Sequence, residues 1–214
     1  MSKLPLPPTS GELRKLSPPV RTLKPGQWLA RISFAGGDHP SDWNQLRHWG
    51  PGSGRFDHHL PDAQGEPRQQ KRGILYVAAD YRTCIAEVFQ RTRVVDVHLN
   101  LPYLAVWQNQ APLNLLDLTG AFVTRMGAST AIHSGNRSRT RQWALAMYEA
   151  WPELHGIAYC SSMNGNAEAF ALNERALAEH PFTATPGSLR MLGDPLIANE
   201  IDSAAWQLGY IVKR

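Results

Sequence analysis

The sequence predicts an α+β fold, in which a β-sheet core is flanked by helices. Short apolar runs rich in branched and aromatic residues, such as 28–34 and 73–79, are typical of strands. The segment 138–151 instead repeats its large apolar residues at the spacing of one helix face. The 214 residues, 43% of them hydrophobic, are enough for one medium domain. We therefore expect one folded unit built from both kinds of element.

The N-terminal segment differs from the rest of the chain in its proline content. Its prolines are Pro5, Pro7, Pro8, Pro18, Pro19 and Pro25. Proline removes a backbone N–H and breaks helices, so we expect a proline-rich, extended N-terminal arm over residues 1–26 that contributes nothing to the core. A single domain then covers residues 27–214.

The first expected strand, WLARISF at 28–34, carries Arg31 in its middle and ends at a turn signal, GGDHPSD. The glycine-rich stretch GPGSGRF at 50–56 places Arg55 where the backbone is free to bend. Residues 57–72 are polar and rich in charge. They predict a long loop.

A second strand leads directly into a helix. Residues 73–79, GILYVAA, predict a buried strand that carries Tyr76. Asp80 is suited to cap the N-terminus of a helix over 81–91, whose apolar residues recur at helical spacing. Glu87 falls at the edge of the apolar face of that helix.

The second half of the chain adds strands and one well-defined helix. The helix over 138–151 ends before Pro152, a residue that often follows a helix. The other segments predict strands within 94–107 and 113–120, a strand into a turn at 155–162, a strand or a helix at 166–176, and a C-terminal strand.

The charge of the chain is a weak indicator of its partners. The net charge is +4 and the sequence pI about 9.3, but the basic residues are dispersed, which does not predict direct nucleic-acid binding. The densest basic cluster is Arg137, Arg139 and Arg141. Such a cluster at the start of a helix is more often solvated surface than a phosphate site.

The sequence favours a cytoplasmic protein. It contains no apolar run of about 18 residues, so we expect no membrane span, and its first residues do not resemble a secretory signal. The two cysteines, Cys84 and Cys160, lie among apolar neighbours and predict no disulfide.

Several common catalytic motifs are missing from the sequence. It has no glycine cradle for nucleotide phosphates and no HEXXH motif. The pair His58 and His59 lacks a convincing third ligand, so no metal site is expected. Ser161 and Ser162 lack the flanking glycines of a nucleophile elbow.

Five polar residues remain near the ends of expected strands: Arg31, Arg55, Tyr76, Glu87 and Ser161. Each also has an ordinary structural interpretation, such as a surface ion pair, a core aromatic residue or a turn former. The local patterns alone do not decide between these interpretations and a functional site.

The order of the motifs resembles a known family. LARIS, GSGRF, GILYVAADYRTCIAEVF, GIAYCSS and NAEAFAL follow one another as in the RES domain, which is named for an arginine, a glutamate and a serine. The resemblance extends over residues 28–175. Its most specific part is the spacing of Tyr76 and Glu87 across a strand and the following helix.

The resemblance implies a fold related to ADP-ribosyltransferase toxins and an activity that breaks the nicotinamide–ribose bond of NAD. Many RES proteins are toxins of toxin–antitoxin pairs, and a helix-turn-helix antitoxin covers their active site. Some use water or phosphate as the acceptor, and others transfer ADP-ribose to a protein. NAD is then a substrate, and no metal is needed. The oligomeric state stays open, and a homo-oligomer is compatible with the sequence.

By the same resemblance, Arg55, Glu87 and Ser161 are the catalytic residues, and Arg31, Arg55, Tyr76 and Ser161 bind NAD. A carboxylate suits the positive charge that develops on ribose when nicotinamide leaves. Guanidinium groups suit the bridging phosphates. Ser161 can donate to phosphate or ribose, and Tyr76 can stack on nicotinamide or fix Glu87 through its hydroxyl.

The chain departs from the family pattern in one place. Phe56 stands where members often have tryptophan, and the loop from there to Gly73 is longer and more charged. Two other readings of the function stay open beside NAD cleavage by water or phosphate. One is protein ADP-ribosylation, and the other is an idle RES-like module that binds a repressor partner. A basic nucleic-acid-binding domain ranks last.

Overall fold

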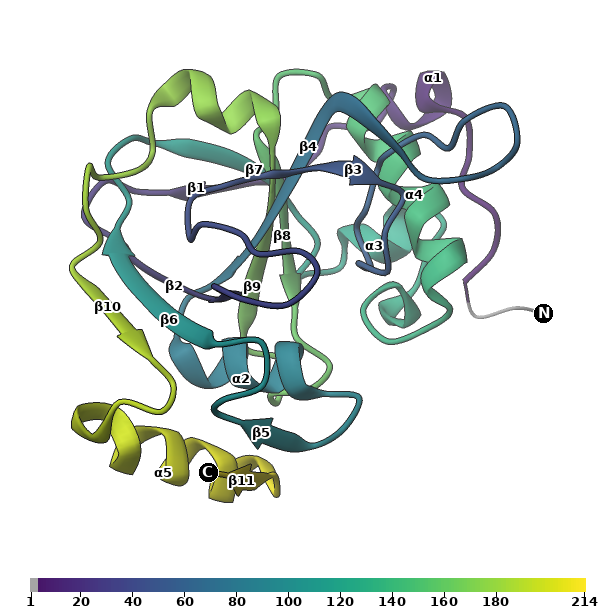
Figure 1. The fold of residues 1–214 in the computed structure, drawn as a ribbon. Coiled ribbons are helices and arrows are strands. Elements are labelled where there is room, and N and C mark those ends of the chain that lie inside the picture. Colours follow the sequence, from purple (N-terminus) through teal and green to yellow (C-terminus); the bar gives the residue numbers. More distant parts are fainter. Residues whose placement is uncertain (1–3) are drawn as a thin grey trace.

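The computed structural model describes residues 4–214 and confirms the α+β class (Figure 1). Residues 1–3 of the predicted arm lie outside the described residues. The helices are α1 (Ser10–Leu13), α2 (Tyr81–Phe89), α3 (Phe122–Arg125), α4 (Arg137–Ala150) and α5 (Ala198–Leu208), with 3₁₀ turns η1 (Thr130–Ile132), η2 (Glu174–Glu179) and η3 (Pro195–Ile197). The strands are β1 (Val20–Leu23), β2 (Trp28–Phe34), β3 (Arg47–Gly50), β4 (Arg68–Ala78), β5 (Val94–Asp96), β6 (Pro102–Gln108), β7 (Leu113–Asp117), β8 (Gly156–Cys160), β9 (Glu168–Asn173), β10 (Ser188–Met191) and β11 (Ile211–Lys213).

A nine-stranded mixed sheet forms the centre of the fold. Its order is β1-β7-β8-β9-β4-β2-β6-β10, and β3 pairs with β4 beside this path. β7 and β8 run parallel, whereas the other neighbours in this sheet are antiparallel. β5 and β11 form a separate parallel pair near the C-terminus. In Figure 1, α3 and α4 lie to the right of the sheet, and α2 and α5 lie below it.

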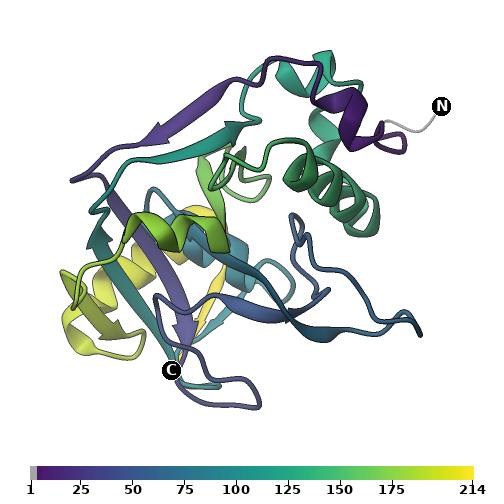
Figure 2. The same ribbon diagram turned by 90° about the horizontal axis from the view of Figure 1, so that it is seen from above.

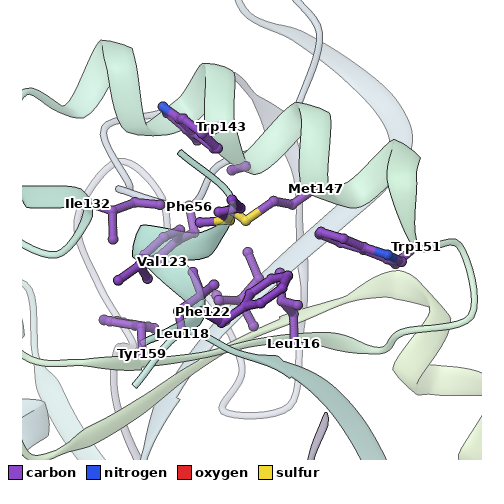
Figure 3. Packing of buried hydrophobic residues seen from close by; sticks show 14 of the residues in the cluster. Phe56, Leu116, Leu118, Phe122, Val123, Ile132, Trp143, Met147, Trp151 and Tyr159 are labelled. Carbon is purple, nitrogen blue, oxygen red and sulfur yellow. The ribbon is translucent and has the colours of Figure 1, made fainter. Parts of the chain in front are cut away.

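The helix α4 buries its apolar side against the strands β7, β8 and β9. Trp143 and Met147 from α4 pack with Phe56, which follows the glycine-rich loop (Figure 3). Figure 3 also shows Leu116 and Tyr159 reaching up from the strands into the same cluster. The glycine-rich loop is thereby fixed to the core immediately beyond Arg55.

The sheet curls, so that strands far apart in its order share a second core. Leu23 of β1, Leu113 of β7 and Trp107 of β6 belong to one buried cluster. Figure 2 shows this curvature from above. A third cluster joins α2 and α5 to β2 and β6 through residues such as Ile85 and Ile201. The helix that carries Glu87 therefore rests on the strand that carries Arg31.

The expectation that the N-terminal arm stays outside the core is wrong for part of the segment. β1 pairs with β7 at one edge of the sheet, and Leu13 and Leu23 are fully buried. Thr9 and Glu12 form a capping box at α1 despite the nearby prolines. The prolines lie between these elements rather than within them. The division at residue 26 stays a prediction.

The long polar loop predicted at 57–72 is also partly wrong. β4 starts at Arg68 rather than at 73, because its polar first half pairs with β3 in a hairpin exposed to solvent. Exposed hairpin strands carry charge on both faces, so the pattern resembled a loop. The buried second half, with Tyr76, lies as predicted.

The remaining elements follow the predictions with small shifts. α2 ends at Phe89 rather than 91, and α4 covers 137–150 rather than 138–151. The segment 94–107 splits into β5 and β6, while 166–176 holds both a strand and a 3₁₀ turn. The C-terminal strand is confirmed as β11, and α5 precedes it. Among residues 4–214, no helix is long and apolar enough to cross a bilayer.

Candidate active site

Local sequence chemistry sets the start of α2, which carries Glu87. Oδ1 of Asp80 accepts a hydrogen bond from the Thr83 amide at 2.9 Å, and Oδ2 accepts one from the Thr83 hydroxyl at 2.8 Å. This cap satisfies a donor that a helix leaves free at its N-terminus. Ile85 and Phe89 are buried, whereas Glu87 is only partly buried. The edge position predicted for Glu87 therefore places its carboxylate at a boundary between core and solvent.

Glu87 faces a large cleft beside the sheet. The cleft has a volume of about 890 Å³. Three of the five predicted site residues line it, namely Arg31, Tyr76 and Glu87. Its other walls come mainly from the loop before β3 and from β3 itself, including His39, Arg47, His48 and Trp49. A cleft of this size is typical of small-molecule sites.

Ser161 lies behind the carboxylate rather than in the wall of the cleft. Its side chain is fully buried, and its Oγ donates a hydrogen bond to Oε1 of Glu87 at 2.6 Å. The same Oγ accepts from the amide of Met163 at 3.2 Å. The turn after β8 thus brings the serine to the glutamate although 74 residues separate them in the chain.

The glycine-rich loop packs directly onto Tyr76. The amide of Phe56 donates to the Tyr76 hydroxyl oxygen at 3.0 Å. A β-carbon on Gly54 would lie 2.5 Å from that oxygen, so only glycine fits there. The Tyr76 hydroxyl therefore contacts the loop, and no hydrogen bond among residues 4–214 joins it to Glu87. Burial raises its pKa above the ordinary tyrosine value, so the hydroxyl stays protonated.

Arg55 does not line the cleft, and its guanidinium lies beside the residues that precede α4. Its Nη1 donates to the carbonyl oxygen of Gly135 at 2.8 Å. Burial lowers the pKa of Arg55, the positive charge of Arg137 lowers it further, and the carboxylate of Glu87 opposes both effects. An arginine remains charged under such a shift. Arg55 is therefore a cation within electrostatic reach of Glu87.

Arg31 supplies a second cation in the cleft. Its Nη1 donates to the carbonyl oxygen of Gln45 at 3.2 Å. Burial lowers the pKa of Arg31 to about 10. Among residues 4–214, no carboxylate lies within ion-pair distance of its guanidinium. The charge of Arg31 is thus uncompensated by any acidic side chain in contact with it.

The sequence pattern did not predict that the arginine cluster at the start of α4 contacts the region around Glu87 and the glycine-rich loop. Arg137 donates from Nη2 to Oε1 of Gln90 at 2.8 Å, and Arg141 donates from Nη1 to the carbonyl of Gly52 at 3.1 Å. Both side chains are partly buried. These two residues are therefore only partly solvated, and each also holds a hydrogen bond to another element. The cluster itself was the available signal, but its partners are distant in the sequence.

The two adjacent histidines have structural partners. His59 hydrogen-bonds to the carboxylate of Asp57, which also accepts from Arg47 at 2.6 Å. Nε2 of His58 lies 3.5 Å from Oε2 of Glu174. Within residues 4–214, no group of three or more His, Cys, Asp or Glu side chains is arranged to hold a metal ion. These contacts hold the loop that follows Phe56.

The α+β fold thus carries a glutamate that accepts a hydrogen bond from a serine, beside a cleft that an arginine also lines. This arrangement is that of a small-molecule site with a fixed carboxylate. The RES domain model matches residues 29–191, so the chain belongs to the RES domain family. Its fold is similar to a chain in the crystal structure of the M. tuberculosis MbcT–MbcA toxin–antitoxin complex. That match has a TM-score of 0.50 and 14% sequence identity, and it covers 85% of this chain and 92% of that chain. No curated protein matches the chain.

Proposed function

We propose that this protein cleaves the bond between nicotinamide and ribose in NAD. The observation that carries the proposal is the Glu87 carboxylate, held by Ser161 and turned toward a cleft that also contains Arg31. When the C–N bond breaks, its electron pair returns to the ring nitrogen and neutral nicotinamide leaves. The ribose then carries positive charge, and a fixed carboxylate stabilises it.

The cations of the site suit the rest of the dinucleotide. The pyrophosphate of NAD is negative, and guanidinium groups bind phosphate with directional hydrogen bonds. Arg31 lines the cleft, and Arg55 lies within electrostatic reach of Glu87. We assign Arg31, within the cleft, and Arg55, just outside its lining, to the negative charge of the pyrophosphate. Tyr76 then offers its ring to the nicotinamide end, since its hydroxyl is already bonded to the loop.

The wall of the cleft that contains His39 and Trp49 suits an aromatic base. His39 and Trp49 both line it, with ring centroids 6.5 Å apart and planes inclined by 25°. Trp49 is 49% exposed, so its ring offers free surface. Aromatic rings stack on bases with little dependence on base identity. This wall would take the adenine half of NAD.

The acceptor for ADP-ribose is water or phosphate in this proposal, which makes the protein an NAD glycohydrolase or phosphorylase. A protein side chain as acceptor, and hence ADP-ribosyltransferase activity, is the alternative. In the cell the protein would act as a cytoplasmic toxin with a helix-turn-helix antitoxin as its partner. Membership of the RES family and the fold shared with a toxin–antitoxin complex support this role.

The test is incubation of the purified protein with NAD, followed by identification of the products with and without phosphate. Nicotinamide with ADP-ribose indicates water as acceptor, and nicotinamide with ADP-ribose-1″-phosphate indicates phosphate. Nicotinamide mononucleotide, which lacks the adenylate half, should be a much poorer substrate if the wall with His39 and Trp49 binds adenine. No metal should be required.

Glu87→Ala and the closely isosteric Glu87→Gln are the decisive variants. Each should lower nicotinamide release by at least about 100-fold, because a fixed electrostatic group of this kind contributes on that scale. Circular dichroism and thermal unfolding serve as the folding control. Full activity in either folded variant contradicts the assignment. Binding of NAD without turnover by the wild type would favour the idle module that binds a repressor partner.

A further inference from the structure

Both carboxylate oxygens of Glu87 accept a hydrogen bond. Oε1 lies 2.6 Å from Oγ of Ser161, and Oε2 lies 3.3 Å from Nε2 of Gln90. The same Gln90 nitrogen lies 2.6 Å from the backbone carbonyl of Glu87, at the end of α2. Two donors on two oxygens fix the plane of the carboxylate, because rotation about its last bond would break one of the contacts.

Arg137 sets the orientation of the Gln90 amide. Its Nη2 donates to Oε1 of Gln90 at 2.8 Å. A guanidinium has only donors, so the amide oxygen must face Arg137 and the amide nitrogen must face Glu87. The reversed amide would set donor against donor at Arg137 and acceptor against acceptor at Glu87. Arg137 thus selects the amide orientation that serves the carboxylate.

Arg137 is itself held where α4 meets the glycine-rich loop. It is the first residue of α4, and its Nη1 donates to the carbonyl of Ser53 at 3.4 Å. Arg141, one turn later, donates to the carbonyl of Gly52. The end of α2, the start of α4 and the loop before Arg55 therefore meet around the Gln90 amide.

We infer that Gln90 and Arg137 are positioning residues that act in series on Glu87. The inference rests on the function proposed above. Arg137 orients the amide of Gln90, and Gln90 holds the Glu87 carboxylate at the angle at which it faces the ribose. Small losses of alignment at a reacting centre have large effects on rate. The pair extends the glutamate and serine of the family motif by two residues that lie outside it.

A direct contact between Arg137 and a substrate phosphate is the competing role, and its kinetic signature is different. Loss of a phosphate contact would raise KM, and its effect would add to that of a change at Gln90. A residue that acts only through Gln90 has nothing further to lose once Gln90 has been replaced. A double-variant cycle therefore separates the two roles.

The experiment compares nicotinamide release from NAD by the full-length wild type, Gln90→Leu, Arg137→Met and the double variant. Each single variant should lower kcat by about 10- to 100-fold with KM within about twofold. The double variant should be no slower than Gln90→Leu alone. Arg139→Met is the matched control, because no side-chain hydrogen bond or ion pair of Arg139 occurs among the described residues. It should keep the wild-type rate.

Three results would overturn the inference while leaving the proposed function intact. These are additive losses of kcat in the double variant, a raised KM with unchanged kcat in Arg137→Met, or a loss in Arg141→Met as large as in Arg137→Met. The last would assign the effect to the loop. If the wild type releases no nicotinamide, the proposed function fails instead. A crystal structure of Arg137→Met then tests positioning alone, with a displaced Glu87 carboxylate expected and an unchanged one contradicting it.

Discussion

The hydroxyl of Ser161 serves two partners in a fully buried position, as donor to Glu87 and acceptor from the amide of Met163. Ser161→Ala removes both contacts and leaves that amide without this partner, which costs about 1–3 kcal/mol of unfolding free energy. We expect this loss of stability together with a fall in kcat of about 10- to 100-fold, because Glu87 loses one of its two donors. Denaturant unfolding and nicotinamide release measure the two effects.

Ser162→Ala is the matched control for this prediction. Ser162 is adjacent in the chain but exposed. Its replacement should leave both stability and rate near those of the wild type. Equal losses in the two variants would refute a specific role for Ser161.

At the scale of single elements, α2 was predictable because its signals are local. Asp80, the apolar spacing after it and the strand before it all lie within one short segment, and the cap is present as expected. The first half of β4 was not predictable in this way. Its strand conformation depends on pairing with β3, whose residues lie about twenty positions earlier. β1 likewise owes its place to β7, from the middle of the chain.

The contact between the glycine-rich loop and β4 gives an element-scale prediction. A β-carbon on Gly54 would meet the Tyr76 hydroxyl and ring at 2.5 to 2.9 Å. Gly54→Ala must therefore push the loop away from β4, at a cost of about 1–3 kcal/mol for an overpacked site. Nicotinamide release should also fall, since Arg55 follows directly. Thermal unfolding and steady-state kinetics test both effects.

Gly120→Ala is the control for Gly54→Ala. A β-carbon on Gly120 would meet nothing within 4 Å. This variant should be neutral. Wild-type stability in Gly54→Ala would show that the loop does not need its close approach to Tyr76.

At the scale of the whole molecule, the partly buried acid Glu174 and the buried histidine His58 tie stability to pH. Burial alone would raise the pKa of Glu174, but His58, Tyr148 and the amide of Gly73 lower it to about 2. Because the folded pKa is depressed, the stabilisation is complete above the unfolded value of 4.5 and is lost as the pH falls from 4.5 to about 2. It is on the order of 3 kcal/mol.

Burial lowers the pKa of His58, so the unfolded chain takes up this proton first as the pH falls below the ordinary histidine value of 6.5. Both groups therefore weaken the fold in acid. Urea unfolding between pH 7 and 3 should show a steep loss of stability. Glu174→Gln should have a flatter profile below pH 4.5, and identical slopes in the two proteins would contradict the role of Glu174.

The residue types of the site could be predicted from the order of the motifs, but their arrangement could not. The sequence indicated Glu87 and Ser161 as separate positions, and only folding reveals one hydrogen bond between them. The role of the α4 arginines depended on Gln90 and on the glycine-rich loop, which are far from them in the chain. Such contacts follow from packing, which local periodicity does not encode.

The guanidinium of Arg31, which no carboxylate contacts among residues 4–214, would link the stability of the fold to the binding of an anionic ligand in the cleft. Among residues 4–214, the guanidinium of Arg31 donates a hydrogen bond only to the backbone carbonyl of Gln45. A partly buried cation of this kind is less stable alone than when an anion meets its charge. A ligand with two phosphates would supply the missing countercharge. By mass action it would then bind the folded state in preference to the unfolded chain. If the cleft binds the proposed dinucleotide, the protein without ligand should therefore be the less stable of its two forms.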